Sequence, residues 1–164
     1  MKRLPFAALP LVAVLAASCG DRGAGSAPPP AAAAPSAAHD AVGEAAASYR
    51  VTALAAPASV ARGGRATVSV EIAMTRPDVH VQQEFPLKVS LAPSAGLKVS
   101  KTVLGHADAL QPEAKGRRWE VDATASERGP QEVQAALRFA ICKETEPAWC
   151  VTRSEAVRAS VEVR

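Results

Sequence analysis

This chain of 164 residues has a small net charge, few aromatic residues and only short apolar runs. Lys2 and Arg3 belong to an expected export signal, and without them seventeen basic residues stand against sixteen acidic ones. This balance argues against nucleic acid as a partner, because phosphate binding needs clustered basic side chains in excess. The apolar run Leu4–Ala17 is too short for a permanent transmembrane helix, which needs about 20 apolar residues.

The motifs of several catalytic classes are also absent. His106-Ala107-Asp108 has no partner serine in an elbow motif, so a hydrolase is not indicated. His80, His106 and Met74 have side chains that suit copper, but no two of them stand at ligand spacing. The sequence therefore predicts no metal and no other cofactor, and a non-enzymatic role is expected ahead of an enzymatic one.

The N-terminus of the chain has the pattern of an export signal. Met1–Ser18 combines two basic residues with an apolar stretch and ends in small residues, as a secretory signal peptide does. Ala16-Ala17-Ser18-Cys19 resembles the lipobox of bacterial lipoproteins, which implies cleavage before Cys19 and a lipid on its thiol. The alternative is ordinary cleavage, which would leave Cys19 as a plain N-terminal thiol. Because Gly20 is not acidic, the resemblance implies the outer membrane, on its periplasmic face, as the location.

Residues 19–47 differ in amino-acid composition from the rest of the chain. From Asp21 to Ala47 the sequence is rich in alanine, proline, glycine and serine, and Val42 is its one apolar residue larger than alanine. Such a segment cannot bury enough surface to offset the entropy of ordering, so we expect a disordered tether. The alanines of Asp40–Ala47 would allow a short helix, but the sequence indicates nothing that would hold it.

From Ser48 to Arg164, apolar and polar residues alternate with the period of two that half-buried strands show. Arg65–Met74 is the clearest case, and turn residues such as Arg128-Gly129-Pro130 fall between the runs. About seven or eight short strands without a helical stripe predict an all-β domain over residues 48–164, an immunoglobulin-like antiparallel β-sandwich. Further alternating stretches are Tyr49–Leu54, Leu87–Leu91, Leu97–Leu104, Trp119–Thr124, Val133–Ile141 and Val157–Val163.

Two cysteines remain for this domain once Cys19 carries lipid. In an oxidising compartment, Cys142 and Cys150 are expected to form a disulfide. A strand precedes the first and another follows the second, so a hairpin can bring their Cα atoms within about 4.4–6.8 Å. Lys143 and Arg153 flank the pair and could favour a thiolate, against acidic neighbours in the loop.

This last hairpin resembles a known redox module. Phe139-Ala140-Ile141-Cys142, a short loop, Trp149-Cys150 and the closing run Glu155–Val163 are similar to the N-terminal immunoglobulin-like periplasmic domain of the DsbD thiol–disulfide interchange proteins. The run Val79–Lys88, a histidine-containing strand before an aromatic-proline step, is similar to related exported domains. The loop is longer than is usual in that family, and Val151-Thr152-Arg153 replaces a proline-rich stretch. The resemblance implies that the two hairpin cysteines carry the exchange.

Two functions are therefore open. The first is a lipid-anchored envelope protein whose sandwich binds another envelope protein, with Cys142–Cys150 as a structural bond and Trp149 as a possible partner contact. The second is thiol–disulfide exchange through the same cysteines, which would pass electrons between exported proteins. Neither the identity of the partner nor the oligomeric state follows from the sequence.

Overall fold

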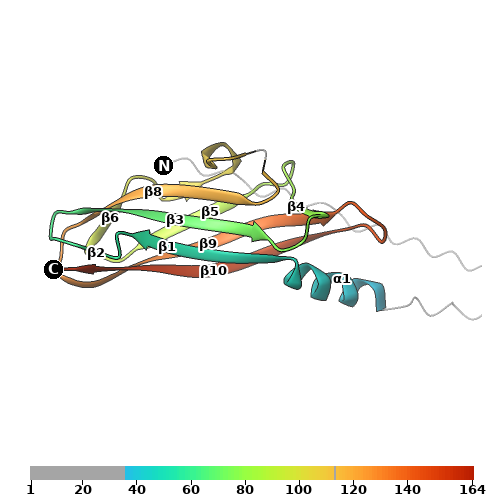
Figure 1. The fold of residues 1–164 in the computed structure, drawn as a ribbon, viewed down its shortest axis with the longest axis horizontal. Helices are drawn as coiled ribbons and strands as arrows, with labels where there is room; N and C mark the ends of the chain where they lie inside the picture. The colour runs from blue at the N-terminus through green and yellow to red at the C-terminus, as the bar shows by residue number, and fades with distance from the viewer. Residues whose placement is uncertain (1–35, 113) are drawn as a thin grey trace, which may run out of the picture. The chain divides into compact units, whose positions relative to one another are not determined.

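A computed structural model of the chain describes residues 36–112 and 114–164, and these form one α-helix, one 3₁₀ turn and ten strands (Figure 1). The expected signal peptide, Cys19 and the first part of the expected tether lie outside the described residues. No helix within these residues has the length and apolar character needed to cross a bilayer. In chain order the elements are α1 (Ser36–Ala47), β1 (Tyr49–Ala56), β2 (Ser59–Val60), β3 (Arg65–Met74), β4 (Val79–Val81), β5 (Lys88–Pro93), β6 (Leu97–Val99), β7 (Val103–Leu104), η1 (His106–Asp108), β8 (Arg117–Ala125), β9 (Gly129–Lys143) and β10 (Trp149–Val163).

The strands form two sheets, and the fold is the immunoglobulin-like β-sandwich that the alternating pattern predicts. One sheet has the order β1-β3-β8-β6. The other has the order β2-β10-β9-β5-β7, and β4 also pairs with β9. All pairs are antiparallel except β2 with β10, which is parallel. The strands outnumber the expected seven or eight because β2, β4 and β7 have two or three residues each, too few for a periodic pattern.

The core lies between the inward faces of the two sheets. Burial alternates residue by residue along most of β3 and all of β8, as half-buried strands require. Trp119 and Phe139 are fully buried, and the indole N–H of Trp119 donates a 2.8 Å hydrogen bond to the carbonyl of Gly105. The ring of Tyr49 meets that of Phe139 edge-on at 5.4 Å between centroids. Small aliphatic side chains fill most of the remaining core, in keeping with the composition.

The prediction of a disordered tether is wrong for residues 36–47, which form α1. This helix is fastened to the sandwich, since Ala45 and the following Ser48 are both fully buried. The carbonyl of Ser48 accepts a 2.9 Å hydrogen bond from the amide of Thr75, and its hydroxyl donates to the carbonyl of Glu44. Side chains from the sandwich bind the Glu44 carboxylate in turn. One glutamate in an alanine-rich run has no periodicity, so the sequence pattern did not reveal what holds the helix.

Candidate functional site

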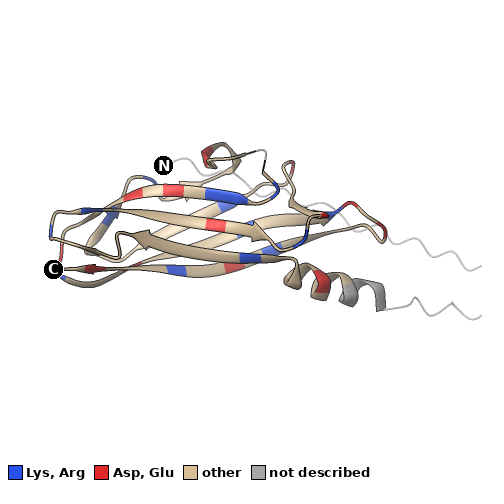
Figure 2. Cartoon of the chain, viewed as in Figure 1, with Lys and Arg blue, Asp and Glu red and all other residues tan. Residues whose placement is uncertain are grey.

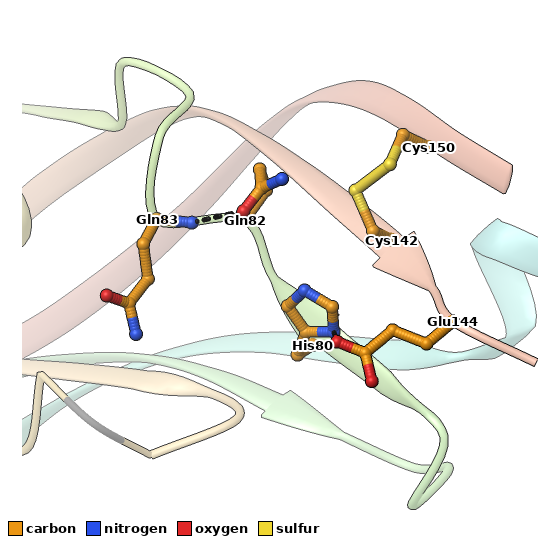
Figure 3. The surroundings of a disulfide bond; sticks show 6 residues. All are labelled: His80, Gln82, Gln83, Cys142, Glu144 and Cys150. Carbon is orange, nitrogen blue, oxygen red and sulfur yellow. Dashed lines mark hydrogen bonds and ion pairs between the residues drawn. A yellow bond between two sulfur atoms is a disulfide. The ribbon is translucent and has the colours of Figure 1, made fainter.

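The strands β9 and β10 form the long hairpin that carries both cysteines of the domain. They pair over fifteen residues in unbroken antiparallel register, from Trp149 opposite Lys143 to Val163 opposite Gly129. Cys150 stands directly opposite Cys142, one pair from the closing loop, with 4.1 Å between the two Cα atoms. Their sulfurs are bonded to each other (Figure 3), so the predicted disulfide is confirmed.

The two cysteines differ in exposure. Cys142 is only 4% exposed, whereas Cys150 is exposed to solvent. The difference follows from the position of each strand in the sheet. At this point β9 has β10 on one side and β4 on the other, whereas β10 is paired with β9 alone. The disulfide is therefore exposed to solvent on the Cys150 side and covered by β4 on the Cys142 side.

A histidine stands beside the buried cysteine. His80 of β4 is the register partner of Cys142, on the side of β9 away from Cys150. Directly opposed residues on neighbouring strands have Cβ atoms about 4.5–5.5 Å apart and share a face of the sheet. Nδ1 of His80 also lies 3.7 Å from a carboxylate oxygen of Glu144, whose side chain is exposed (Figure 3). The sequence offered His80 as a copper ligand and as part of the run Val79–Lys88 that resembles related exported domains. Its position next to Cys142 could not be predicted, because it depends on a strand pairing between distant segments.

Six residues, 82–87, interrupt the sheet edge between β4 and β5 near the disulfide. The amide of Gln82 donates a 2.9 Å hydrogen bond to the carbonyl of Ala140, which extends the pairing of β4 by one step. The imidazole of His106 then holds the loop, because its Nε2–H donates to the carbonyl of Phe85 at 2.9 Å. Figure 3 shows Gln82 and Gln83 where this loop leaves the disulfide region. His106 thus has a structural contact in the described fold.

The remaining candidates from the sequence do not meet at one place. Asp108 does not orient His106; it accepts hydrogen bonds from Lys101 and from the backbone N–H of Gly105. Lys101 is the largest cause that lowers the pKa of Asp108, followed by that backbone bond. Met74 lies at the end of β3, packed against the core. Residues 36–112 and 114–164 contain no group of three or more His, Cys, Asp or Glu side chains that could hold a metal ion.

The two basic residues next to the cysteines turn to the opposite face of the sheet. Neighbours in a strand alternate in direction, so Lys143 and Arg153 point inward while the cysteines point outward. Lys143 is 8% exposed, and its ammonium donates to Glu44 at 3.0 Å. Nε of Arg153 donates to the hydroxyl of Tyr49 at 2.7 Å. The sequence left open whether these cations favour a thiolate against the acidic loop residues; in the structure both bind side chains on the inward face of the sheet.

One carboxylate joins α1 to this inward face. Glu44 accepts hydrogen bonds from Lys143 and from the indole N–H of Trp149, the latter at 2.9 Å. It also pairs with Arg76 at 2.6 Å, and Arg76 in turn binds both oxygens of Asp78. The hydrogen bond from Lys143 is the largest cause that lowers the pKa of Glu44, and the bond from Trp149 is the next. Elsewhere, basic and acidic residues are interspersed along the strands (Figure 2).

Trp149 is half-buried and belongs to this anchoring network. Its ring packs against the core at the start of β10, and its N–H donates to Glu44. The side chain therefore has a contact within the domain that accounts for its position. Its role as a contact for a partner protein stays a prediction.

Fold and site together define a small immunoglobulin-like β-sandwich with a disulfide in its last hairpin. No protein-family model matches the chain, and no curated protein matches it. Among solved structures, the collagen-binding subdomain of the Enterococcus faecalis surface protein ACE is similar to it at a TM-score of 0.35 and 7% identity. The similarity covers 66% of this chain and 94% of that one. A likeness at this level supports no argument about function.

Proposed function

We propose that this chain is an exported lipoprotein whose sandwich domain exchanges electrons with other envelope proteins through the Cys142–Cys150 disulfide. The observation that carries the proposal is the asymmetry of the pair. An exposed Cys150 gives an attacking thiolate access to one sulfur, while Cys142, 4% exposed, is the sheltered leaving group. A bond at the solvent edge of a sheet suits exchange better than one enclosed in the core.

The exchange has two steps and transfers two electrons. In the first, a thiolate of a partner dithiol attacks Sγ of Cys150 and forms a mixed disulfide. The Cys142–Cys150 bond breaks, and Cys142 leaves with the electron pair and then takes up a proton. In the second step, the partner's other thiolate attacks the partner sulfur that is bonded to Cys150. This forms a disulfide within the partner and releases the thiolate of Cys150, which is then protonated. The partner is oxidised to a disulfide and the domain is reduced to two thiols; the reverse sequence passes the electrons onward.

His80 has a place in this scheme because it is the register neighbour of Cys142. An imidazole beside a leaving sulfur can stabilise the thiolate or exchange a proton with it. The side of Cys142 away from Cys150 is occupied by β4, so attack on that sulfur is hindered. We therefore assign Cys150 as the sulfur that is attacked and Cys142 as the one that leaves.

The location in the envelope rests on the sequence. The signal Met1–Ser18 and the lipobox-like Ala16-Ala17-Ser18-Cys19 support export and a lipid on Cys19. The lipid would hold the domain at the outer membrane facing the periplasm, where disulfides persist. Another envelope protein is the expected partner.

A pair of trapping variants tests the assignment. The full-length lipoprotein is purified in detergent as Cys142→Ser or Cys150→Ser and reacted with oxidised glutathione, with mixed disulfides measured by mass spectrometry. Cys142→Ser, which keeps the exposed thiol, should form the adduct about tenfold faster than Cys150→Ser. Equal rates, or faster reaction of Cys150→Ser, would contradict the assignment. A lipidated Cys19 is a thioether and does not contribute.

A second candidate is a binding domain in which Cys142–Cys150 is purely structural. Its support is the network around Glu44, which ties α1 to Lys143 and Trp149 at the same end of the hairpin. Such a bond would stabilise the hairpin that supports an interaction surface. A redox titration separates the two candidates, because structural disulfides of exported proteins have potentials below about −300 mV and exchanging ones lie higher.

A further inference from the structure

The strand β10 has an open hydrogen-bonding edge that begins at the exposed cysteine. β9 covers one side of β10 along its full length. On the other side, β2 pairs with β10 only at Glu162 and Val163. Between Cys150 and Ser160, no other described strand pairs with that edge. Figure 1 shows β10 with β9 beside it and with the short β2 near its C-terminal end.

The hydrogen bonds to β2 identify which backbone groups face the open edge. The amide of Glu162 donates to the carbonyl of Ala58, and the amide of Arg164 donates to the carbonyl of Val60, each at 2.9 Å. Backbone groups of every second residue point to the same side of a strand. Because the register of β10 is unbroken, the N–H and C=O of the even-numbered residues from 150 to 160 point to this edge. None of these groups has a hydrogen-bond partner among the described residues.

The geometry of the disulfide relates this edge to the chemistry. Cys142 and Cys150 are opposed in the ladder, so the S–S bond runs across the sheet from β9 to β10 (Figure 3). A nucleophile attacks a disulfide sulfur on the side opposite to the leaving sulfur. For attack on Cys150, that position lies beyond the open edge of β10. A residue opposite Cys150 on an added strand would have its Cβ about 4.5–5.5 Å away, within reach of the sulfur.

We infer that the partner presents its reactive cysteine on an extended segment that adds to the open edge of β10 as a further strand. This inference rests on the proposed exchange function and specifies its substrate class. Main-chain hydrogen bonds would provide the affinity, as in other cases of strand addition, and would tolerate different side chains. Apart from Arg158, the outward side chains beside the added strand are small: Thr152, Ser154, Ala156 and Ser160. The bond changes are those of the two-step exchange with Cys150.

Inward charges restrict what can occupy this edge. Arg153 and Glu155 of β10 are both bound by the hydroxyl of Tyr49 from the opposite sheet. Charged inward residues of this kind protect an edge strand from pairing with an apolar strand of another molecule. The added segment must therefore place small or polar side chains over this pair. A short hydrophilic segment with one cysteine meets that condition better than a second copy of β10.

A proline in β10 tests the inference. In Ser154→Pro, the lost N–H faces the open edge, so no hydrogen bond to β9 is removed, and edge strands tolerate proline at such positions. Ser154→Ala is the matched control, because it keeps the N–H. The probe is a ten-residue peptide of alternating threonine and serine with one central cysteine, reacted with the oxidised full-length protein. Dithiothreitol, which needs no strand addition, serves as the second reductant.

Ser154→Pro should slow mixed-disulfide formation with the peptide about tenfold or more, while dithiothreitol should reduce wild type and variant at rates within about twofold. A peptide with N-methyl groups on alternate residues should react as slowly with the wild-type protein, which tests the edge even if Ser154→Pro does not fold. Unchanged peptide rates in both comparisons would overturn the inference. A wild-type dimer that Ser154→Pro converts to a monomer would overturn it too, since the edge would then hold a second copy. Failure of the exchange function itself would look different: glutathione and peptide would both leave Cys150 unmodified in the wild-type protein.

Discussion

Reducing Cys142–Cys150 removes a cross-link between residues eight positions apart in the sequence, and the effect on stability can be worked out. Closing a loop of that length restricts the unfolded chain and, by the chain-entropy relation, stabilises the fold by about 2.5 kcal/mol at 25 °C. That value assumes that the folded protein accommodates the disulfide and the two thiols with no difference in strain or other interaction energy. A thermodynamic cycle connects it to the redox potential, since 1.4 kcal/mol corresponds to about 30 mV for two electrons. A purely structural bond should then be about 54 mV more reducing in the folded protein than in the unfolded chain.

The exchange function predicts a smaller difference. The reduced hairpin should keep its register, because β9 is paired on both sides and its ladder with β10 spans fifteen residues. His80 beside Cys142 should also stabilise the reduced pair. We therefore expect reduction to lower the free energy of unfolding by less than about 1 kcal/mol, equivalent to about 20 mV.

The measurement is urea unfolding of the full-length protein, oxidised and reduced, followed by far-UV circular dichroism. The double variant Cys142→Ser/Cys150→Ser is the control for the reduced form and should unfold at the same urea concentration. A glutathione titration gives the potential independently, and the two values must agree within the cycle. A loss of about 2.5 kcal/mol or more on reduction would refute the argument and favour a structural bond.

Other predictions concern the core and the anchor. Trp119→Ala should lower the free energy of unfolding by about 3–5 kcal/mol, because the indole is fully buried. Trp119→Phe should cost about 1–3 kcal/mol, since it removes the indole's hydrogen bond to the carbonyl of Gly105, which keeps only the 3.2 Å bond from the amide of Asp108, and leaves a smaller ring in the core; equal urea midpoints for the wild type and Trp119→Phe would contradict this. Cys19→Ala should abolish incorporation of labelled palmitate in cells that incorporate it into the wild-type protein, and an unlabelled wild type would contradict the lipid anchor.

Much of the sandwich could be predicted because its strands alternate. The bounds expected for β3, Arg65–Met74, are those observed. For β9 the alternation starts at Val133, but the strand begins at Gly129. Gly129 and Pro130 have turn chemistry, and Gly129 has a positive φ of 98°, yet both are in register with the end of β10. Local propensity therefore predicted the strand but missed four residues at its start and two at its end, all of which pair with β10.

The surroundings of the disulfide could not be predicted in the same way. The pairing of Cys142 with Cys150 follows from two cysteines in one hairpin. The placement of His80, in contrast, depends on the pairing of β4 with β9, which are far apart in the sequence. The contacts of Glu44 with Lys143 and Trp149 span 99 and 105 positions in the sequence. No periodicity encodes contacts of that kind. They depend on how the sheets stack and on where α1 meets the end of the sandwich.

The Glu44 network makes the docking of α1 depend on pH in a definite direction. Hydrogen bonds from Lys143 and Trp149 lower the pKa of Glu44 in the folded protein, so the ionised carboxylate stabilises the docked helix. This contribution is complete at neutral pH and is lost as the pH falls below the ordinary range of a glutamate and through its lowered folded value. The indole N–H resonance of Trp149 in NMR spectra should shift in that acid range. Glu44→Gln should abolish the titration, whereas Glu127→Gln, at an exposed turn, should leave it unchanged. Asp78 also has a lowered pKa, mainly through Arg76, but its contacts are to Arg76 and Thr145, so persistence of the Trp149 shift in Glu44→Gln would refute the role of Glu44.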